Sequence, residues 1–143
     1  MDYRLIDINT IKTEDKGNLS FFEASRDIPF EIKRVYYVHG VDIDTERGGH
    51  AHKELEQLLW CPYGCIEIII DDGINEKETV VLDNPSQGLY VPKLLYRDII
   101  WQKKYSVLCV VASNYYDEND YIRNYNDFVE YIKGVKWKFH LMY

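Results

Sequence analysis

Short apolar runs recur along this chain, and turn signals separate them. The runs are rich in β-branched and aromatic residues, which favour extended strands. Pairs such as Gly17-Asn18, Asp72-Gly73 and Asn84-Pro85 mark turns between runs. We therefore expect strands over residues 3–8, 19–23, 31–38, 50–60, 65–70, 78–82, 88–91, 99–101 and 105–112. Many short strands at near-regular spacing predict an all-β sandwich or small barrel.

The C-terminal part of the chain has a different pattern. Residues 126–134 combine Asn and Asp as candidate caps, an apolar stripe and a closing Gly134, which predicts one short helix. The acidic segment 117–120 fits a solvated loop, and this pattern leaves its role open. Because the sequence shows no repeat, low-complexity linker or composition break, we expect residues 1–143 to form a single domain.

Composition excludes some partners and favours others. The formal net charge of −7 makes a nucleic-acid backbone an improbable partner. No signal peptide or membrane-length apolar run is present, so we expect a cytoplasmic protein with no membrane partner. The odd count of three cysteines argues against a disulfide framework. The 13 tyrosines favour strands and interfaces, and thus an oligomer.

The segment Arg47-Gly-Gly-His-Ala-His52 carries the strongest chemical signal. Side chains alternate along a strand, so His50 and His52 point to the same face. Two imidazoles on one face suggest a metal site or acid–base chemistry. A third interpretation is that both rings are buried, hydrogen-bonded core residues, although each would then need polar partners.

The metal interpretation is weakened by one position. The chain resembles metal-binding jelly rolls of the cupin type, whose first motif is His-x-His followed by Glu, as in His50, His52 and Glu56. Their second motif places a histidine five residues after a proline, whereas Pro92 is followed at that distance by Arg97. A guanidinium is always charged and has no lone pair for a cation. We therefore expect no functional metal.

Most of the chain is similar to the dTDP-sugar 3,4-ketoisomerase family. The similar segments are 32–38, 47–53, 71–73, 88–92 and 112–123, and the histidine motif and the last segment are the most specific. The resemblance implies a cupin jelly roll that converts dTDP-4-keto-6-deoxy-D-glucose to a 3-keto isomer. It further implies no metal or other cofactor, and a homodimer that exchanges N-terminal strands. Where many members have Trp-His-Glu, this chain has Tyr96-Arg97-Asp98.

The isomerisation requires a base for the C3 proton, which the neighbouring ketone acidifies. Histidine titrates near neutrality and suits this transfer. We expect His52 to be the C3 base and His50 to hold or relay protons at the oxygens, although the two roles are interchangeable on this reasoning. Tyr37 is a candidate to stabilise the oxyanion, with core packing as the alternative.

Arginines are the candidates for the diphosphate, because their planar fork matches phosphate oxygens. Arg47 is the strongest candidate, followed by Arg34 and Arg97. Arg123 matches a family position, but pairing with Asp117, Glu118 or Asp120 is an alternative role.

Several other functions remain open. Replacement of the family's histidine by Arg97 favours the gluco-configured product over the galacto isomer. The nearest alternative enzyme is a dTDP-sugar 3,5-epimerase, which has one histidine in the corresponding segment and a longer chain. A nucleotide-sugar-binding cupin and a metal-dependent dioxygenase are the remaining alternatives.

Overall fold

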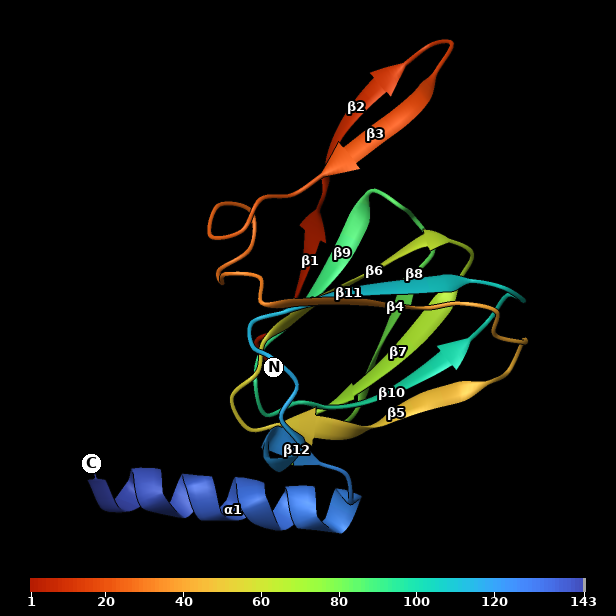
Figure 1. Cartoon of the computed structure of the whole chain (residues 1–143). Coiled ribbons are helices and arrows are strands. Elements are labelled where there is room, and N and C mark those ends of the chain that lie inside the picture. Colours follow the sequence, from red (N-terminus) through yellow and green to blue (C-terminus); the bar gives the residue numbers. More distant parts are fainter. Residues whose placement is uncertain (143) are drawn as a thin grey trace.

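Two five-stranded antiparallel sheets face each other and form the body of the molecule (Figure 1). In this computed structural model, which describes residues 1–142, the strand orders are β1-β9-β6-β11-β4 and β12-β5-β10-β7-β8. The strands of the two sheets are β1 (Arg4–Asp7), β4 (Arg34–Val38), β5 (Glu46–His52), β6 (Gln57–Tyr63), β7 (Ile66–Asp71), β8 (Glu78–Leu82), β9 (Gln87–Val91), β10 (Tyr96–Trp101), β11 (Val107–Ala112) and β12 (Tyr121–Ile122). The predicted all-β jelly roll with one C-terminal helix is confirmed.

The apolar faces of the two sheets make the main core. In β7, Ile66, Ile68 and Ile70 are fully buried, as a side-chain period of two requires. Each buried isoleucine contributes roughly 1.5–3 kcal/mol through removal of its side chain from water. Leu59 of β6 and Trp101 of β10 belong to the same cluster. The core therefore fixes the relative position of both sheets.

The expected single strand over residues 50–60 was wrong. The chain ends β5 at His52 and begins β6 at Gln57, in the other sheet. Between them, the backbone N–H groups of Lys53 and Glu54 donate to the carbonyl and carboxylate oxygens of Asp120, at 2.9 and 2.8 Å. These contacts satisfy the backbone where it leaves the sheet, so the chain can cross without unpaired donors.

The C-terminal helix is longer than expected. Helix α1 spans Tyr125–Met142, and Gly134 does not end it. Asn124 caps its first turn, because its side-chain oxygen accepts from the backbone N–H of Asp127 at 3.0 Å. Phe128 and Ile132 are buried against Tyr96 and other residues of the second sheet. Within residues 1–142, no helix has the length and apolarity to cross a membrane.

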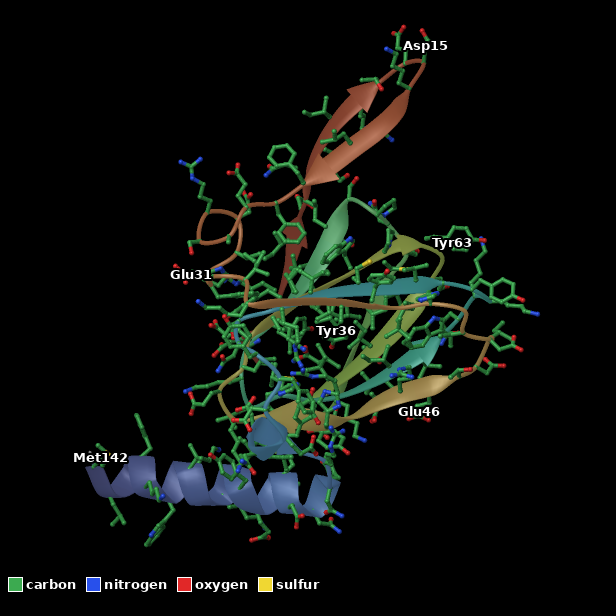
Figure 2. All side chains as sticks on the ribbon, viewed as in Figure 1. Asp15, Glu31, Tyr36, Glu46, Tyr63 and Met142 are labelled. Atoms are coloured by element: carbon green, nitrogen blue, oxygen red, sulfur yellow. The ribbon has the colours of Figure 1, made fainter. Side chains whose placement is uncertain are left out.

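A hairpin, β2 (Asn9–Thr13) and β3 (Gly17–Phe21), projects away from the two sheets (Figure 1). Its tip is marked by Asp15 (Figure 2). Strand β2 was not predicted, because its sequence is polar. The two-residue strand β12 and the short 3-10 helix η1 (Glu118–Asp120) were not predicted either. Ile11 and Leu19 are more than half exposed on the hairpin, and a lone two-stranded ribbon is marginally stable in water.

Candidate active site

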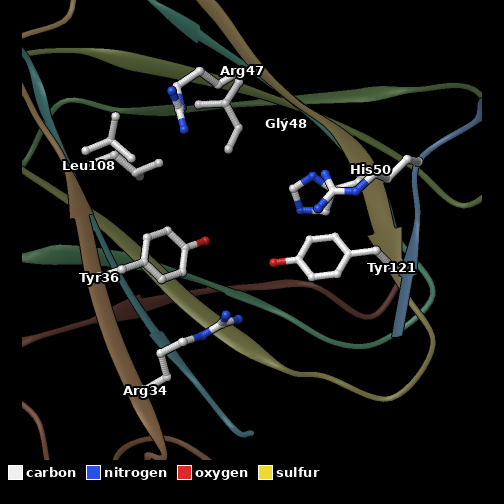
Figure 3. A pocket seen from close by; sticks show the side chains of 10 residues that line it. Arg34, Tyr36, Arg47, Gly48, His50, Leu108 and Tyr121 are labelled. Atoms are coloured by element: carbon white, nitrogen blue, oxygen red, sulfur yellow. The ribbon is translucent and has the colours of Figure 1, made fainter. Parts of the chain in front are cut away.

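A cavity of about 490 Å³ opens between the two sheets (Figure 3). Strands β4 and β11 line it from one sheet, and β5, β10 and β12 from the other. Its walls are mainly basic, aromatic and aliphatic, and they comprise Arg34, Tyr36, Val38, Arg47, Gly48, His50, Ile99, Leu108, Tyr121 and Arg123. The cavity therefore combines cationic groups with a histidine, as a site for an anionic substrate requires.

Strand β4 decides which tyrosine belongs to the cavity. Arg34, Tyr36 and Val38 share the inward face, so Tyr37 points outward, where it is 64% exposed. The expectation that Tyr37 stabilises an oxyanion is corrected by this alternation, because Tyr36 takes the inward position. The hydroxyl groups of Tyr36 and Tyr121 both project into the cavity (Figure 3). Tyr36 lies two residues after Arg34, so strand alternation puts the two side chains on the same face. This spacing is the signal by which the sequence could have indicated Tyr36 as a cavity residue.

Two glycines shape the strand that carries the histidines. Gly48 and Gly49 have φ angles of +87° and +69°, a region that disfavours residues with a Cβ atom. A Cβ on Gly48 would lie 2.8 Å from the carbonyl oxygen of Arg97 on β10. The β5–β10 register is irregular at this point, and Arg97 then pairs with His50. The two glycines thus permit the close approach that sets His50 opposite Arg97.

His50 lines the cavity and is half-buried. Burial, followed by the charge of Arg97, lowers its pKa to about 4, so the ring is neutral near pH 7. Its ring centroid is 5.0 Å from that of His52, with the two planes almost perpendicular. The prediction that both rings share one face is confirmed. A neutral imidazole exposed to the cavity has the lone pair that a base needs.

His52 lies deeper and is 0% exposed. Its Nδ1 atom is 3.1 Å from Oδ2 of Asp120, and its Nε2 atom is buried without a hydrogen-bond partner. Burial and Arg97 lower its pKa to about 2. The ring of Tyr121 packs beside it, with centroids 4.4 Å apart. His52 is therefore a neutral ring under the cavity wall, where the sequence had suggested a base at its surface.

Arg97 is buried beneath the site rather than displayed in it. It is 1% exposed, and its two Nη atoms donate to Gln57 Oε1 at 2.6 Å and to the carbonyl of Leu95 at 3.0 Å. Burial lowers its pKa to about 10, so it stays charged at neutral pH. Since it does not line the cavity, the expectation that Arg97 binds the diphosphate is corrected. Its charge instead disfavours protonation of both histidines.

Gln57 connects Arg97 to the cavity wall. Its Oε1 atom accepts from Arg97, and its Nε2 atom donates to the hydroxyl of Tyr36 at 3.2 Å. Arg97 and the outward-facing Tyr37 were singled out from the sequence, whereas Gln57 and Tyr36 were not. Their roles depend on contacts between three different strands, which only the fold brings together.

The other three predicted arginines do line the cavity, and Arg47 is exposed there. Arg34 is half-buried, and its Nε and Nη2 atoms have no hydrogen-bond partner. Arg123 forms an exposed ion pair with Glu118, with an Nε–Oε1 distance of 2.6 Å, and its guanidinium lies 4.2 Å from the centroid of Tyr121. The pairing alternative for Arg123 is thus observed, although the residue also borders the cavity.

The glutamate of the metal-type motif is used elsewhere. Glu56 accepts a hydrogen bond from the hydroxyl of Tyr90. In the part of the chain that the structure describes, no three His, Cys, Asp or Glu side chains form a cluster suited to a metal ion. Both histidines instead lie close enough to Arg97 to feel its charge. Of the two, His52 contacts the carboxylate of Asp120.

Comparisons with known proteins identify the family of this chain. The family described as "FdtA: WxcM-like, C-terminal" matches residues 1–133. A TDP-4-oxo-6-deoxy-alpha-D-glucose-3,4-oxoisomerase from Aneurinibacillus thermoaerophilus is 42% identical over 94% of this chain and 96% of its own length.

Two solved structures are similar over most of their length. One is a histidine-to-asparagine mutant of the 3,4-ketoisomerase QdtA from Thermoanaerobacterium thermosaccharolyticum, in complex with TDP-4-keto-6-deoxyglucose. It has 41% identity and a TM-score of 0.88, over 93% of this chain and 95% of that one. The other is a 3,4-ketoisomerase from Helicobacter canadensis, with 38% identity and a TM-score of 0.89, over 93% and 98%. Together with the family match, these similarities show that this chain belongs to the FdtA family.

Proposed function

We propose that this protein is a nucleotide-sugar 3,4-ketoisomerase that acts on dTDP-4-keto-6-deoxy-D-glucose. The observation that carries the proposal is the pair of neutral histidines on one face of an arginine-lined cavity. Relatives of 38–42% identity bear the corresponding names, and one is bound to this keto sugar. The product is the 3-keto isomer, and no cofactor takes part.

His50 is the base that removes the C3 proton. It borders the cavity, whereas His52 is fully buried, and this reverses the assignment that the sequence favoured. Loss of the C3 proton produces an enediolate with its charge on O4. The O4 atom then gains a proton, O3 loses its proton, and C4 is protonated. These transfers exchange the ketone and hydroxyl without an external oxidant or reductant.

Two groups stabilise the negative charge of the enediolate. The hydroxyl of Tyr36 projects into the cavity and can donate a hydrogen bond to the sugar oxygen. Arg97 contributes a positive charge from beneath the cavity wall. Because Arg97 is buried, little water screens the electric field of this charge at the sugar. This role for Arg97 replaces the direct contact with the diphosphate.

The diphosphate lies against Arg34, Arg47 and Arg123. All three border the cavity, and Arg34 has two buried nitrogen atoms without hydrogen-bond partners. Guanidinium groups bind phosphate oxygens through paired, charge-assisted hydrogen bonds. For Arg123, substrate binding competes with its ion pair to Glu118.

The reaction requires no metal ion. Arg97 places a buried positive charge beside both histidines, and this charge repels a cation from the position between them. The carboxylate of Glu56 is engaged by Tyr90. Full activity after treatment with a chelator is expected. Loss of turnover with a chelator, followed by recovery with one divalent ion, would contradict this part of the proposal.

The product has the gluco configuration at C4. In the gluco sugar the C3 and C4 hydrogens lie on opposite ring faces, so His50 cannot return the same proton to C4 from its own side. Arg97 is a poor acid and does not border the cavity, so the donor to the opposite face is a water molecule or one of the cavity hydroxyls of Tyr36 and Tyr121. After trapping of the product as an equatorial 3-amino sugar, a large H3–H4 coupling is expected. A small coupling would assign the galacto product.

The protein forms a homodimer in which the N-terminal hairpins are exchanged. The projecting β2–β3 ribbon exposes Ile11 and Leu19, and neither five-stranded sheet of the same chain covers them. A second copy supplies that cover. Light scattering at micromolar concentration is expected to give twice the mass of the chain, and a monomer would contradict the exchange.

The cytoplasm is the proposed location. Cys61, Cys65 and Cys109 are all free, as is usual where thiols are kept reduced.

The decisive experiment is NMR of the purified protein with dTDP-4-keto-6-deoxyglucose in deuterated water. An isomerase moves the ketone to C3 and introduces deuterium at C4. A 3,5-epimerase would leave the ketone at C4 and exchange the protons at C3 and C5. A binding protein without activity would leave the sugar unlabelled.

A further inference from the structure

Asp120 belongs to the acidic segment 117–120, for which the sequence suggested a solvated loop or a partner for Arg123. In the structure its side chain is only 15% exposed, and both carboxylate oxygens are used. Oδ2 lies 3.1 Å from Nδ1 of His52, and Oδ1 accepts from the backbone N–H of Glu54 at 2.8 Å. The carbonyl oxygen of Asp120 also accepts from Lys53 at 2.9 Å. Three contacts thus hold this residue against the end of β5.

This arrangement determines which nitrogen of His52 carries the proton. A carboxylate only accepts hydrogen bonds, so the contact with Asp120 requires a proton on Nδ1. The pKa of His52 is lowered to about 2, mainly by burial, so the ring is neutral and has a single N–H. Its Nε2 atom therefore carries a lone pair, and that atom is buried with no hydrogen-bond partner.

We propose that Asp120 is a positioning residue that holds His52 in the Nδ1–H tautomer, so that the ring packed against the cavity base His50 keeps a fixed orientation and an unprotonated Nε2. This inference rests on the proposed ketoisomerase function. His52 exchanges no proton with the sugar, because its ring is fully buried and does not border the cavity. It acts through His50, whose ring it contacts.

The Asp120→Asn variant tests this inference. Asparagine keeps an oxygen for the N–H of Glu54 but turns an NH2 group towards Nδ1, which moves the proton of His52 to Nε2. An N–H on Nε2 would disturb the ring of His50 beside it, and the upper limit of the loss is the roughly 10⁴-fold seen when a base itself takes the wrong tautomer. We expect kcat to fall by about 10²–10⁴-fold, while the Kd for TDP changes by less than about threefold. The ¹⁵N shifts of His52 should change from the Nδ1–H to the Nε2–H pattern.

Asp117→Asn is the matched control, because this acidic residue of the same segment contacts only the backbone of η1 through its side chain. It should leave kcat and the His52 tautomer unchanged. Thermal unfolding verifies that each variant is folded. If the asparagine variant does not fold, Asp120→Glu decides the matter, since a retained carboxylate should preserve the Nδ1–H pattern.

Two results would overturn the inference: an Nε2–H tautomer in the unchanged protein, or a folded Asp120→Asn variant with undiminished kcat. The tautomer is measured without substrate, so it tests Asp120 independently of the reaction. Absence of turnover by the unchanged protein would instead refute the ketoisomerase function.

Discussion

The site contains two groups of ionisable side chains, an inner and an outer one, and their difference separates chemistry from binding. The inner group comprises His50, His52, Arg97 and Asp120, whose side chains are mostly buried. Asp120 contacts Nδ1 of His52, and the two histidine rings meet edge to face. The outer arginines, Arg34, Arg47 and Arg123, border the cavity, and Arg47 and Arg123 are exposed to solvent.

Water screens these two groups to different degrees. In the inner group, burial and Arg97 keep both histidines neutral, so each ring retains an unprotonated nitrogen. Among the outer arginines, Arg47 and Arg123 are exposed to water, so dissolved ions screen their attraction for phosphate. Variants of the inner group should therefore change kcat, and variants of the outer arginines should change KM.

The largest effect is expected for His50→Asn. Asparagine preserves polarity but cannot accept the C3 proton, so kcat should fall by roughly 10²–10⁴-fold, while the Kd for TDP stays within a few-fold. Turnover assays and calorimetric titration with TDP provide the two measurements. His39→Asn is the control, because His39 is exposed, and this variant should leave kcat and the Kd for TDP unchanged. Near-normal turnover by the His50 variant would remove this residue from the mechanism.

A smaller and different effect is expected for Arg47→Ala. Loss of one charge-assisted phosphate contact should raise KM and the Kd for TDP by roughly 10–100-fold, with a much smaller change in kcat. The effect should weaken at high salt, because ions screen an exposed charge. Lys104→Ala removes an exposed cation outside the cavity and should change neither constant. If the Arg47 variant lost kcat alone, the division between inner and outer groups would fail.

Adjacent tyrosines give a sharper comparison on β4. Tyr36→Phe removes a hydroxyl that faces the cavity, and kcat should fall by about 10-fold, as expected for loss of one hydrogen bond of about 1.5 kcal/mol. Tyr37→Phe removes an outward-facing hydroxyl and should have no effect. Steady-state kinetics of both variants measure the contrast. Equal losses in the two variants would show that the inward and outward faces were wrongly assigned.

The smallest expected effect is a shift in the pH dependence of kcat/KM when Arg97 is replaced. Because the pKa of His50 is lowered to about 4, kcat/KM should stay level as pH falls from 7 to about 5 and decline only near pH 4, where the base becomes protonated. Arg97→Gln removes a repulsive charge, so the decline should begin at a higher pH. Rate measurements across pH for both proteins test this. A decline near pH 6.5 in the unchanged protein would mean that His50 is not desolvated as described.

The sequence predicted the parts of this molecule that depend on local patterns. Alternation and β-branched runs located most strands, and the His50–His52 spacing placed both rings on one face. It did not reveal the crossing between β5 and β6, because the apolar run at Leu58 resembles a continuation of the same strand. The contacts of Asp120 with His52 and of Gln57 with Arg97 were not predicted, because the partners lie 68 and 40 residues apart. Neither contact has a local signature in the chain.

The same long separations have a consequence for how the protein acquires its activity during folding. The contacts His52–Asp120 and Gln57–Arg97 close large loops, and contacts of this kind carry a high entropic cost and slow folding. No isolated hairpin contains both members of either pair. A nascent chain can therefore form individual ribbons early, but the proton-transfer group is assembled only when both sheets and the segment before α1 have come together.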